Sequence, residues 1–91
     1  FIIDELLRET MLTYLHKEIP YNVNIETSNF KHLKNNDIKI KQKIIINQKR
    51  YKKIILGRKG EMIKKIREDS QKKMSQILNA KIHLYLEILN A

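Results

Sequence analysis

The sequence predicts a two-layer α+β domain with the element order α-β-β-α-α-β and a three-stranded mixed sheet covered by helices on one face. Segments 21–27 and 38–46 alternate apolar and polar residues, the period of a half-buried strand. Segments 2–17 and 61–78 repeat apolar residues every three to four positions, the period of an amphipathic helix. The last strand, 82–88, follows a helix, so it is expected to pair in parallel with 38–46 through a right-handed crossover.

The first helix is expected over residues 2–17 and the first strand directly after it. The predicted buried stripe of the helix consists of Ile3, Leu7, Met11, Tyr14 and Leu15. Pro20, the only proline, ends the helix and biases Ile19 towards an extended conformation. The strand then places its apolar side chains on one face: Tyr21, Val23, Ile25 and Thr27.

A polar turn at Asn35-Asn36-Asp37 is expected to join the first two strands into an antiparallel hairpin. The second strand turns its isoleucines towards the core: Ile38, Ile40, Ile44 and Ile46. Its lysines point the other way: Lys39, Lys41 and Lys43. We interpret these lysines as a solvated sheet face, in preference to a second binding site or a contact to a larger assembly.

The second half of the chain is expected to hold two helices and the last strand. Within 48–56, the spacing of Tyr51, Ile54 and Ile55 favours a short helix over a strand. The buried stripe of the long helix is predicted to be Ile63, Ile66, Ser70, Met74, Ile77 and Leu78, with Asn79 as its C-cap. In the last strand, alternating side chains are expected to face the core: Ile82, Leu84, Leu86 and Ile88.

The only two glycines, Gly57 and Gly60, form a Gly-X-X-Gly sequence between the two helices. Glycine has no Cβ and takes positive φ readily, so backbone can approach a ligand closely there. A turn at the start of a helix also directs free N–H groups at an anion. Arg58 and Lys59 fill the gap between the glycines, which favours a phosphate backbone as the anion.

The charge distribution supports a polyanion partner. The formal net charge is +9 over 91 residues. Residues 1–30 have a net charge of −3, residues 31–43 of +4, and residues 49–73 of +8, because eleven cations there oppose three acids. The positive charge is therefore centred on the glycine sequence, as expected for a nucleic-acid-binding surface.

The sequence gives no support for an enzyme, a metal-binding protein or a membrane-spanning protein. The length fits one domain over residues 1–91, and Phe1 at the start indicates a piece of a longer protein. There is no cysteine, His16, His32 and His83 lack a second ligand at metal spacing, and the acidic residues form no catalytic pair. No apolar run reaches the length of a membrane span. We therefore expect a binding domain without catalytic residues, metal or cofactor of its own.

Three segments resemble the C-terminal type II KH domain of the Era family of bacterial GTPases. The first is the entry to the domain, Asp4–Thr10 followed by Glu18-Ile19-Pro20-Tyr21-Asn22-Val23. The second is Ile55–Ile66, which holds the glycine loop, and the third is Lys81–Leu86, which is similar to the family's closing strand. The GTPase half of the family has no counterpart here, since the phosphate-binding signature G-x-x-x-x-G-K-[ST] does not occur.

The resemblance implies a single-stranded RNA-binding module that clamps about four nucleotides. It implies as partners the 3′ end of small-subunit ribosomal RNA and the small ribosomal subunit, in the cytoplasm, with a weak peripheral contact at the inner membrane face. Apart from the resemblance, three apolar helix stripes matched to one apolar sheet face predict that the domain is a monomer. GTP and Mg²⁺ are implied only for the GTPase domain. The RNA-binding residues are then expected to be Lys53, Ile54, Ile55, Leu56, Gly57, Arg58, Lys59, Gly60, Met62, Ile63 and Lys64.

Two alternatives stay open at the level of the sequence. One is a KH domain of another ribosomal or mRNA-binding protein. The other is a basic module that meets a membrane or another protein, for which an exposed apolar helix face would be the discriminating feature. The sequence specifies neither the RNA sequence bound nor any dependence of binding on GTP.

Overall fold

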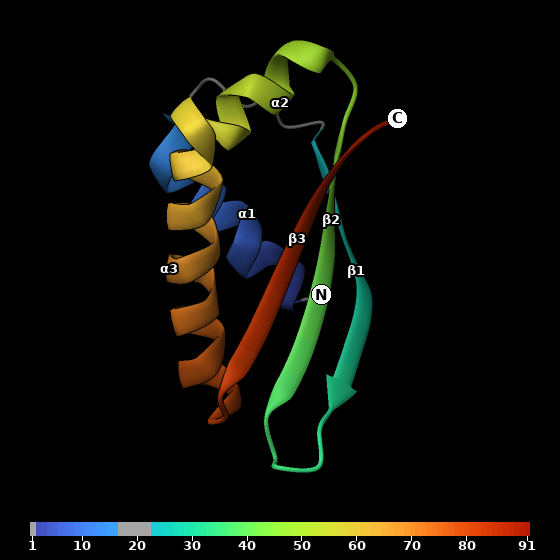
Figure 1. Cartoon of the computed structure of the whole chain (residues 1–91), viewed down its shortest axis with the longest axis vertical. Coiled ribbons are helices and arrows are strands. Elements are labelled where there is room, and N and C mark those ends of the chain that lie inside the picture. Colours follow the sequence, from blue (N-terminus) through green and yellow to red (C-terminus); the bar gives the residue numbers. More distant parts are fainter. Residues whose placement is uncertain (1, 17–22) are drawn as a thin grey trace.

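The computed structural model describes residues 2–16 and 23–91 of the chain. The elements follow the predicted order: α1 (Ile2–Leu15), β1 (Asn24–His32), β2 (Ile38–Ile46), α2 (Lys49–Leu56), the 3₁₀ turn η2 (Arg58–Gly60), α3 (Glu61–Leu78) and β3 (Ile82–Asn90). Figure 1 shows α1 and α3 together on one side of the sheet, with α2 at one end of the molecule. The two-layer α+β prediction is confirmed.

The sheet has the strand order β1-β2-β3, so β2 is the central strand. It pairs antiparallel with β1 and parallel with β3. The parallel register sets Ile38 beside Ile82 and Ile44 beside Ile88. Because β3 lies at the edge, no other described strand pairs with its side away from β2. In Figure 1, β3 runs beside α3 towards the end of the molecule that holds α2.

The core lies between the helices and the sheet. The sheet contributes isoleucines from β2, and Ile40 and Ile44 are 0% exposed. The helices contribute Leu7, Ile55, Ile66 and Met74, which are also fully buried. At roughly 1.5–3 kcal/mol for each large side chain removed from water, this single cluster is the main source of stability.

One polar group joins the two layers inside this core. The Gln42 side chain on β2 is 1% exposed, and its Nε2 donates hydrogen bonds to the Ile3 carbonyl at 3.3 Å and to Asp4 Oδ1 at 3.1 Å. Thr27 on β1 donates to the same Asp4 oxygen at 2.6 Å. A buried amide is costly unless it is hydrogen-bonded, so these bonds fix how α1 sits on the sheet.

The last strand runs two residues past its predicted end, to Asn90. Further details differ from the sequence prediction or fall outside the described residues. The first helix ends at Leu15, because His16 has a φ of 53°. The first strand continues to His32, past the predicted end at Thr27. Ile77 is 57% exposed, so its assignment to the buried stripe of α3 is wrong; the stripe passes from Met74 to Leu78 instead. The predictions for Ile19, Pro20 and Tyr21 lie outside the described residues.

Candidate nucleic-acid interface

The glycine loop turns the chain sharply between α2 and α3. Gly57 has φ 71° and ψ −177°, a combination that essentially only glycine adopts. Lys59 and Gly60 follow in the left-handed region, with φ values of 55° and 76°. The Gly57 N–H donates to the Lys53 carbonyl at 2.9 Å, and the Gly60 N–H donates to the Gly57 carbonyl at 3.2 Å. These bonds make the loop a defined structure rather than a loose link.

The surroundings of the two glycines explain the absence of a side chain in different ways. A Cβ built on Gly57 would lie 2.5 Å from Met62 Cβ and 3.0 Å from the Met62 backbone nitrogen. A Cβ on Gly60 would have no heavy atom of the described residues within 4 Å. Gly57 is therefore required by both its backbone conformation and its close approach to α3. Gly60 leaves open space in front of the first turn of α3.

The first turn of α3 faces that open space without a side-chain cap from its N-cap residue. That residue is Gly60, which has no side chain to accept a hydrogen bond from the turn. The Glu61 N–H donates to the Arg58 carbonyl within the loop. Uncapped N–H groups and the helix dipole both favour an anion at this place.

Cations surround the loop and point into solvent. The side chains of Lys53, Arg58, Lys59 and Lys64 are all exposed. None of the four forms an ion pair with any described residue. An unpaired cation keeps its charge available for a ligand and gives up no internal partner when the ligand binds. Glu61 is the nearest opposing charge in the sequence.

Half-buried apolar residues flank the loop on both sides. Ile54 and Leu56 come from α2, and Met62 and Ile63 come from the start of α3. Each is neither fully buried nor fully exposed, so each offers part of its side chain to the surface. Ile55 differs, because it is 0% exposed and belongs to the core beneath the loop. The surface at the loop thus combines a polar, cationic turn with half-buried apolar side chains on both sides of it.

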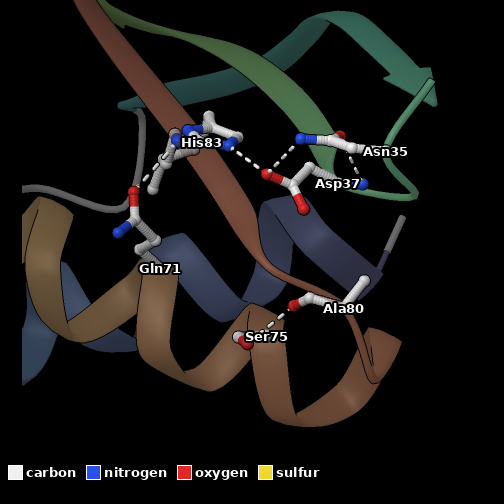
Figure 2. A network of polar contacts seen from close by, with 7 residues as sticks. Asn35, Asp37, Gln71, Ser75, Ala80 and His83 are labelled. Atoms are coloured by element: carbon white, nitrogen blue, oxygen red, sulfur yellow. Dashed lines mark hydrogen bonds and ion pairs between the residues drawn. The ribbon is translucent and has the colours of Figure 1, made fainter. Parts of the chain in front are cut away.

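The free edge of β3 adds backbone donors and acceptors near α3. The Leu84 N–H donates to Gln71 Oε1 on α3 at 3.0 Å, so this N–H points away from β2 (Figure 2). By the two-residue period of a strand, the N–H groups of Leu86 and Ile88 face the same way. Gln71 was not among the predicted site residues, and no pattern in the sequence indicates its contact with a strand thirteen positions away.

A second contact that the sequence did not predict is made by His83, the neighbour of Leu84 at the start of β3. His83 Nε2 and Asp37 Oδ2 are 2.7 Å apart, and Asn35 Nδ2 donates to the same carboxylate at 3.3 Å (Figure 2). This pair joins the β1–β2 turn to β3. It gives His83 a structural contact and no metal ligand, and the described residues contain no group of three or more His, Cys, Asp or Glu that could hold a metal ion.

None of the helices described, over 2–16 and 23–91, is both long and apolar enough to cross a membrane.

A glycine loop between two helices, with a free strand edge beside them, is the arrangement expected of a KH domain, and the family comparison agrees. The sequence pattern of the KH domain family matches residues 18–90. A match over this much of the chain shows that the chain belongs to the KH domain family.

Within that family, the chain is similar to the bacterial protein GTPase Era. It is 41% identical over 86 residues to GTPase Era of Ehrlichia canis, a match that covers 94% of this chain and 29% of that protein. GTPase Era of Rickettsia typhi matches with the same identity and coverage. The chain thus spans less than a third of the length of these relatives.

Two solved Era structures share the fold. One, from Aquifex aeolicus and bound to GDP·AlF4⁻, superposes with a TM-score of 0.90 at 25% identity and covers 99% of this chain and 31% of its own. The other is Era in complex with MgGDPNP and nucleotides 1506–1542 of 16S ribosomal RNA; it has the same TM-score and identity, with coverage of 99% and 30%.

Proposed function

We propose that this chain is the single-stranded RNA-binding domain of an Era-type GTPase. The observation that supports it most is the loop itself. A Gly-X-X-Gly turn with two cations that pair with no described residue precedes an uncapped 18-residue helix, at the centre of the most basic part of the chain. The similarity to GTPase Era and to a solved Era–RNA complex supports the choice of ligand.

The proposed binding mode assigns a task to each part of the site. The exposed N–H groups at the start of α3, with Arg58 and Lys59, hold the phosphates as the strand crosses the loop. Ile54, Leu56 and Ile63 provide an apolar floor under the bases. The free edge of β3 offers backbone groups to base edges. Ile55 supports this floor from within the core, and Met62 fills the space against Gly57.

The finer identity of the RNA rests on the relatives. In the solved Era complex the RNA is a segment of 16S ribosomal RNA, so we propose the small-subunit ribosomal RNA 3′ end and the small ribosomal subunit as partners. A cytoplasmic location with a weak peripheral membrane contact rests on the resemblance to the family alone. GTP hydrolysis, with its nucleotide and Mg²⁺, belongs to the GTPase part of the relatives, and the G-x-x-x-x-G-K-[ST] signature is not in this sequence.

The experiment that tests this proposal is a charge reversal in the loop. In the double variant Arg58→Asp and Lys59→Asp, two anions replace two cations beside the phosphate path. We expect the affinity for a short single-stranded RNA to fall by at least roughly tenfold, about 1.4 kcal/mol, measured by equilibrium titration. Stability is expected to change by about 0.5 kcal/mol or less, because both side chains are exposed.

The matched control reverses two exposed lysines at the opposite end of the molecule, Lys34 and Lys81, and so changes the net charge equally. Lys34 lies in the β1–β2 turn and Lys81 directly before β3. Figure 1 shows this turn and the start of β3 at the end of the molecule away from α2. We expect this control to bind nearly as well as the unmodified chain. Equal decreases in the two variants would mean that only overall charge attracts the RNA, and the loop would not be the site.

A further inference from the structure

The face of the sheet that turns away from the helices, which we call the open sheet face, has a regular arrangement of side chains. The strand registers fix three rows across it. The rows are Lys31, Lys39 and His83; then Asn29, Lys41 and Tyr85; then Glu26, Lys43 and Glu87. Helices α1 and α3 lie on the other side of the sheet (Figure 1).

The positive charges on this face are concentrated at one end. Lys31 and Lys39 are directly opposite each other on β1 and β2, and Lys41 lies one row further along. Like charges directly opposite on a sheet destabilise it, so the repulsion between Lys31 and Lys39 lowers the stability of the protein when no ligand is bound. The neighbouring acids contact other residues: Glu26 and Glu87 flank Lys43 in the third row, and Asp37, beside the first row, pairs with His83. A polyanion would remove the repulsion between the three lysines.

An aromatic ring lies beside these lysines. Tyr85 is 52% exposed, one of the few large apolar side chains so open to solvent. Lys39 Nζ lies 5.6 Å from the centroid of its ring, a cation–π distance. An exposed ring flanked by cations is the arrangement by which proteins bind single-stranded nucleic acids, since bases stack on the ring and phosphates meet the cations.

A hollow opens next to the same ring. The β1–β2 register shifts between Thr27 and Asn29, so Ser28 is an extra residue and its Oγ donates to the Lys41 carbonyl at 3.3 Å. Beside this bulge lies a hollow of about 310 Å³, within the size range of small-ligand pockets. Its lining residues are Ser28, Lys41, Gln42, Tyr85, Leu86 and Glu87.

We propose that the open sheet face is a second contact for single-stranded RNA, in which a base stacks on Tyr85 and the neighbouring phosphates lie on Lys31, Lys39 and Lys41. Glu87, in the lining of the hollow, is placed to accept a hydrogen bond from an exocyclic amino group of that base. An acidic protein segment would use the lysines but leave the ring without a stacking partner, so the observations favour RNA. The proposal takes its ligand class from the proposed function, but its site is separate from the glycine loop.

The test compares two lengths of RNA on matched variants of this chain. A tetranucleotide fills one groove, whereas a single strand of about twelve nucleotides can occupy two surfaces. In Tyr85→Ala we expect affinity for the longer RNA to fall at least about fivefold, the effect of removing one stacked base. Tyr85→Phe keeps the ring and is expected to bind normally. The tetranucleotide should bind both variants as it binds the unmodified chain, which also shows that they are folded.

The lysines are tested with Lys39→Gln and Lys41→Gln together. The slope of log K against log salt for the longer RNA should become shallower by roughly 0.7 for each phosphate that the variant fails to neutralise. Polyglutamate serves as the acidic-protein probe, and it is expected to displace the longer RNA poorly. Efficient displacement by polyglutamate, with no dependence on Tyr85, would overturn the proposal in favour of an acidic protein partner.

The outcomes separate this proposal from the function proposed above. If the longer RNA binds Tyr85→Ala as well as the unmodified chain, while the Arg58→Asp and Lys59→Asp variant fails, the second contact does not exist and the loop proposal stands. If the longer RNA depends on Tyr85 and not on the loop, the open sheet face is the site and the loop proposal is wrong. If neither RNA binds the unmodified chain, both proposals fail.

Discussion

Gly57 and Gly60 have different structural roles, although they are identical residues in one motif. Gly57 combines a φ of 71° and a ψ of −177° with an approach to Met62 too close for any Cβ. Gly60 also has positive φ, but its α-carbon faces open space. The first glycine therefore holds α2 and α3 in their relative positions, and the second keeps the approach to the helix clear.

This difference predicts unequal effects of alanine at the two sites. Gly60→Ala should cost about 1–2 kcal/mol of unfolding free energy, the usual penalty for an alanine in the left-handed region. Gly57→Ala should cost more, about 3 kcal/mol or above, because steric overlap with Met62 adds to a backbone conformation that only glycine adopts readily. Urea denaturation of both variants measures this, and equal decreases would contradict the assignment of Gly57 as the packed position.

Lys59 is the third residue of the loop with positive φ, and it is not a glycine. A lysine in the left-handed region has a cost of roughly 1–2 kcal/mol that glycine would avoid. Its exposed side chain has no ion pair with any described residue that could offset this cost. The retained strain fits a lysine whose charge serves a ligand, in line with the loop proposal.

At the scale of elements, the periodicity of the sequence predicted the strands and helices that bury one whole face. It missed the positions at which a single side chain departs from that pattern. The strand β2 was predicted correctly because every second position along it is buried, by four isoleucines and by Gln42. The end of β1 was missed because the bulge at Ser28 breaks the alternation and leaves Phe30 on the core side but 39% exposed. Ile77 was misassigned because a helical stripe at its end offers two neighbouring positions, and only Leu78 packs inwards.

The contacts between elements were beyond prediction for a similar reason. Nothing in the sequence relates Gln71 to the Leu84 N–H or Asp37 to His83, since each pair meets only after the crossover from β2 to β3 has formed. The loop residues, by contrast, are adjacent in the chain, so their pattern could be found directly. A site whose residues are adjacent in the chain can be predicted from the sequence, whereas a contact between distant segments can be predicted only once the topology of the fold is known.

The Asp37–His83 contact leads to a prediction about the β1–β2 turn. Asp37→Ala is expected to lower the unfolding free energy by about 1–2 kcal/mol, because it removes a part-buried hydrogen bond between the turn and β3. A double-mutant cycle with His83→Ala isolates the pair. We expect the two effects to be less than additive by at least about 0.5 kcal/mol. Full additivity would mean that the two side chains do not stabilise each other.

At the scale of the whole molecule, acidic and basic residues are concentrated in different parts of the chain, as the proposed function requires. The first helix carries acids, Asp4, Glu5 and Glu9, in a part of the chain whose net charge is negative. Eleven cations fall within residues 49–73, which comprise α2, the loop and most of α3. Such a distribution attracts a polyanion to the surface formed by α2, the loop and α3 before any specific contact forms.

The expectation that the domain is a monomer stays a prediction. A single apolar cluster fills the space between the helices and the sheet, which is consistent with a domain that folds by itself.

The charge of the domain, the glycine loop and the free edge of β3 all support one claim. The claim is that a single strand of RNA crosses the loop between α2 and α3.

The most direct measurement of that claim is amide chemical-shift mapping by NMR, with a single-stranded tetranucleotide added to the labelled chain. The account predicts the largest changes at residues 53–64, smaller ones at Leu86 and Ile88 on the free edge of β3, and little change in the β1–β2 turn. A duplex of the same sequence should cause much weaker changes, because its base edges are closed off from a KH groove. Shifts spread evenly over all exposed lysines, or equal shifts with the duplex, would contradict the account.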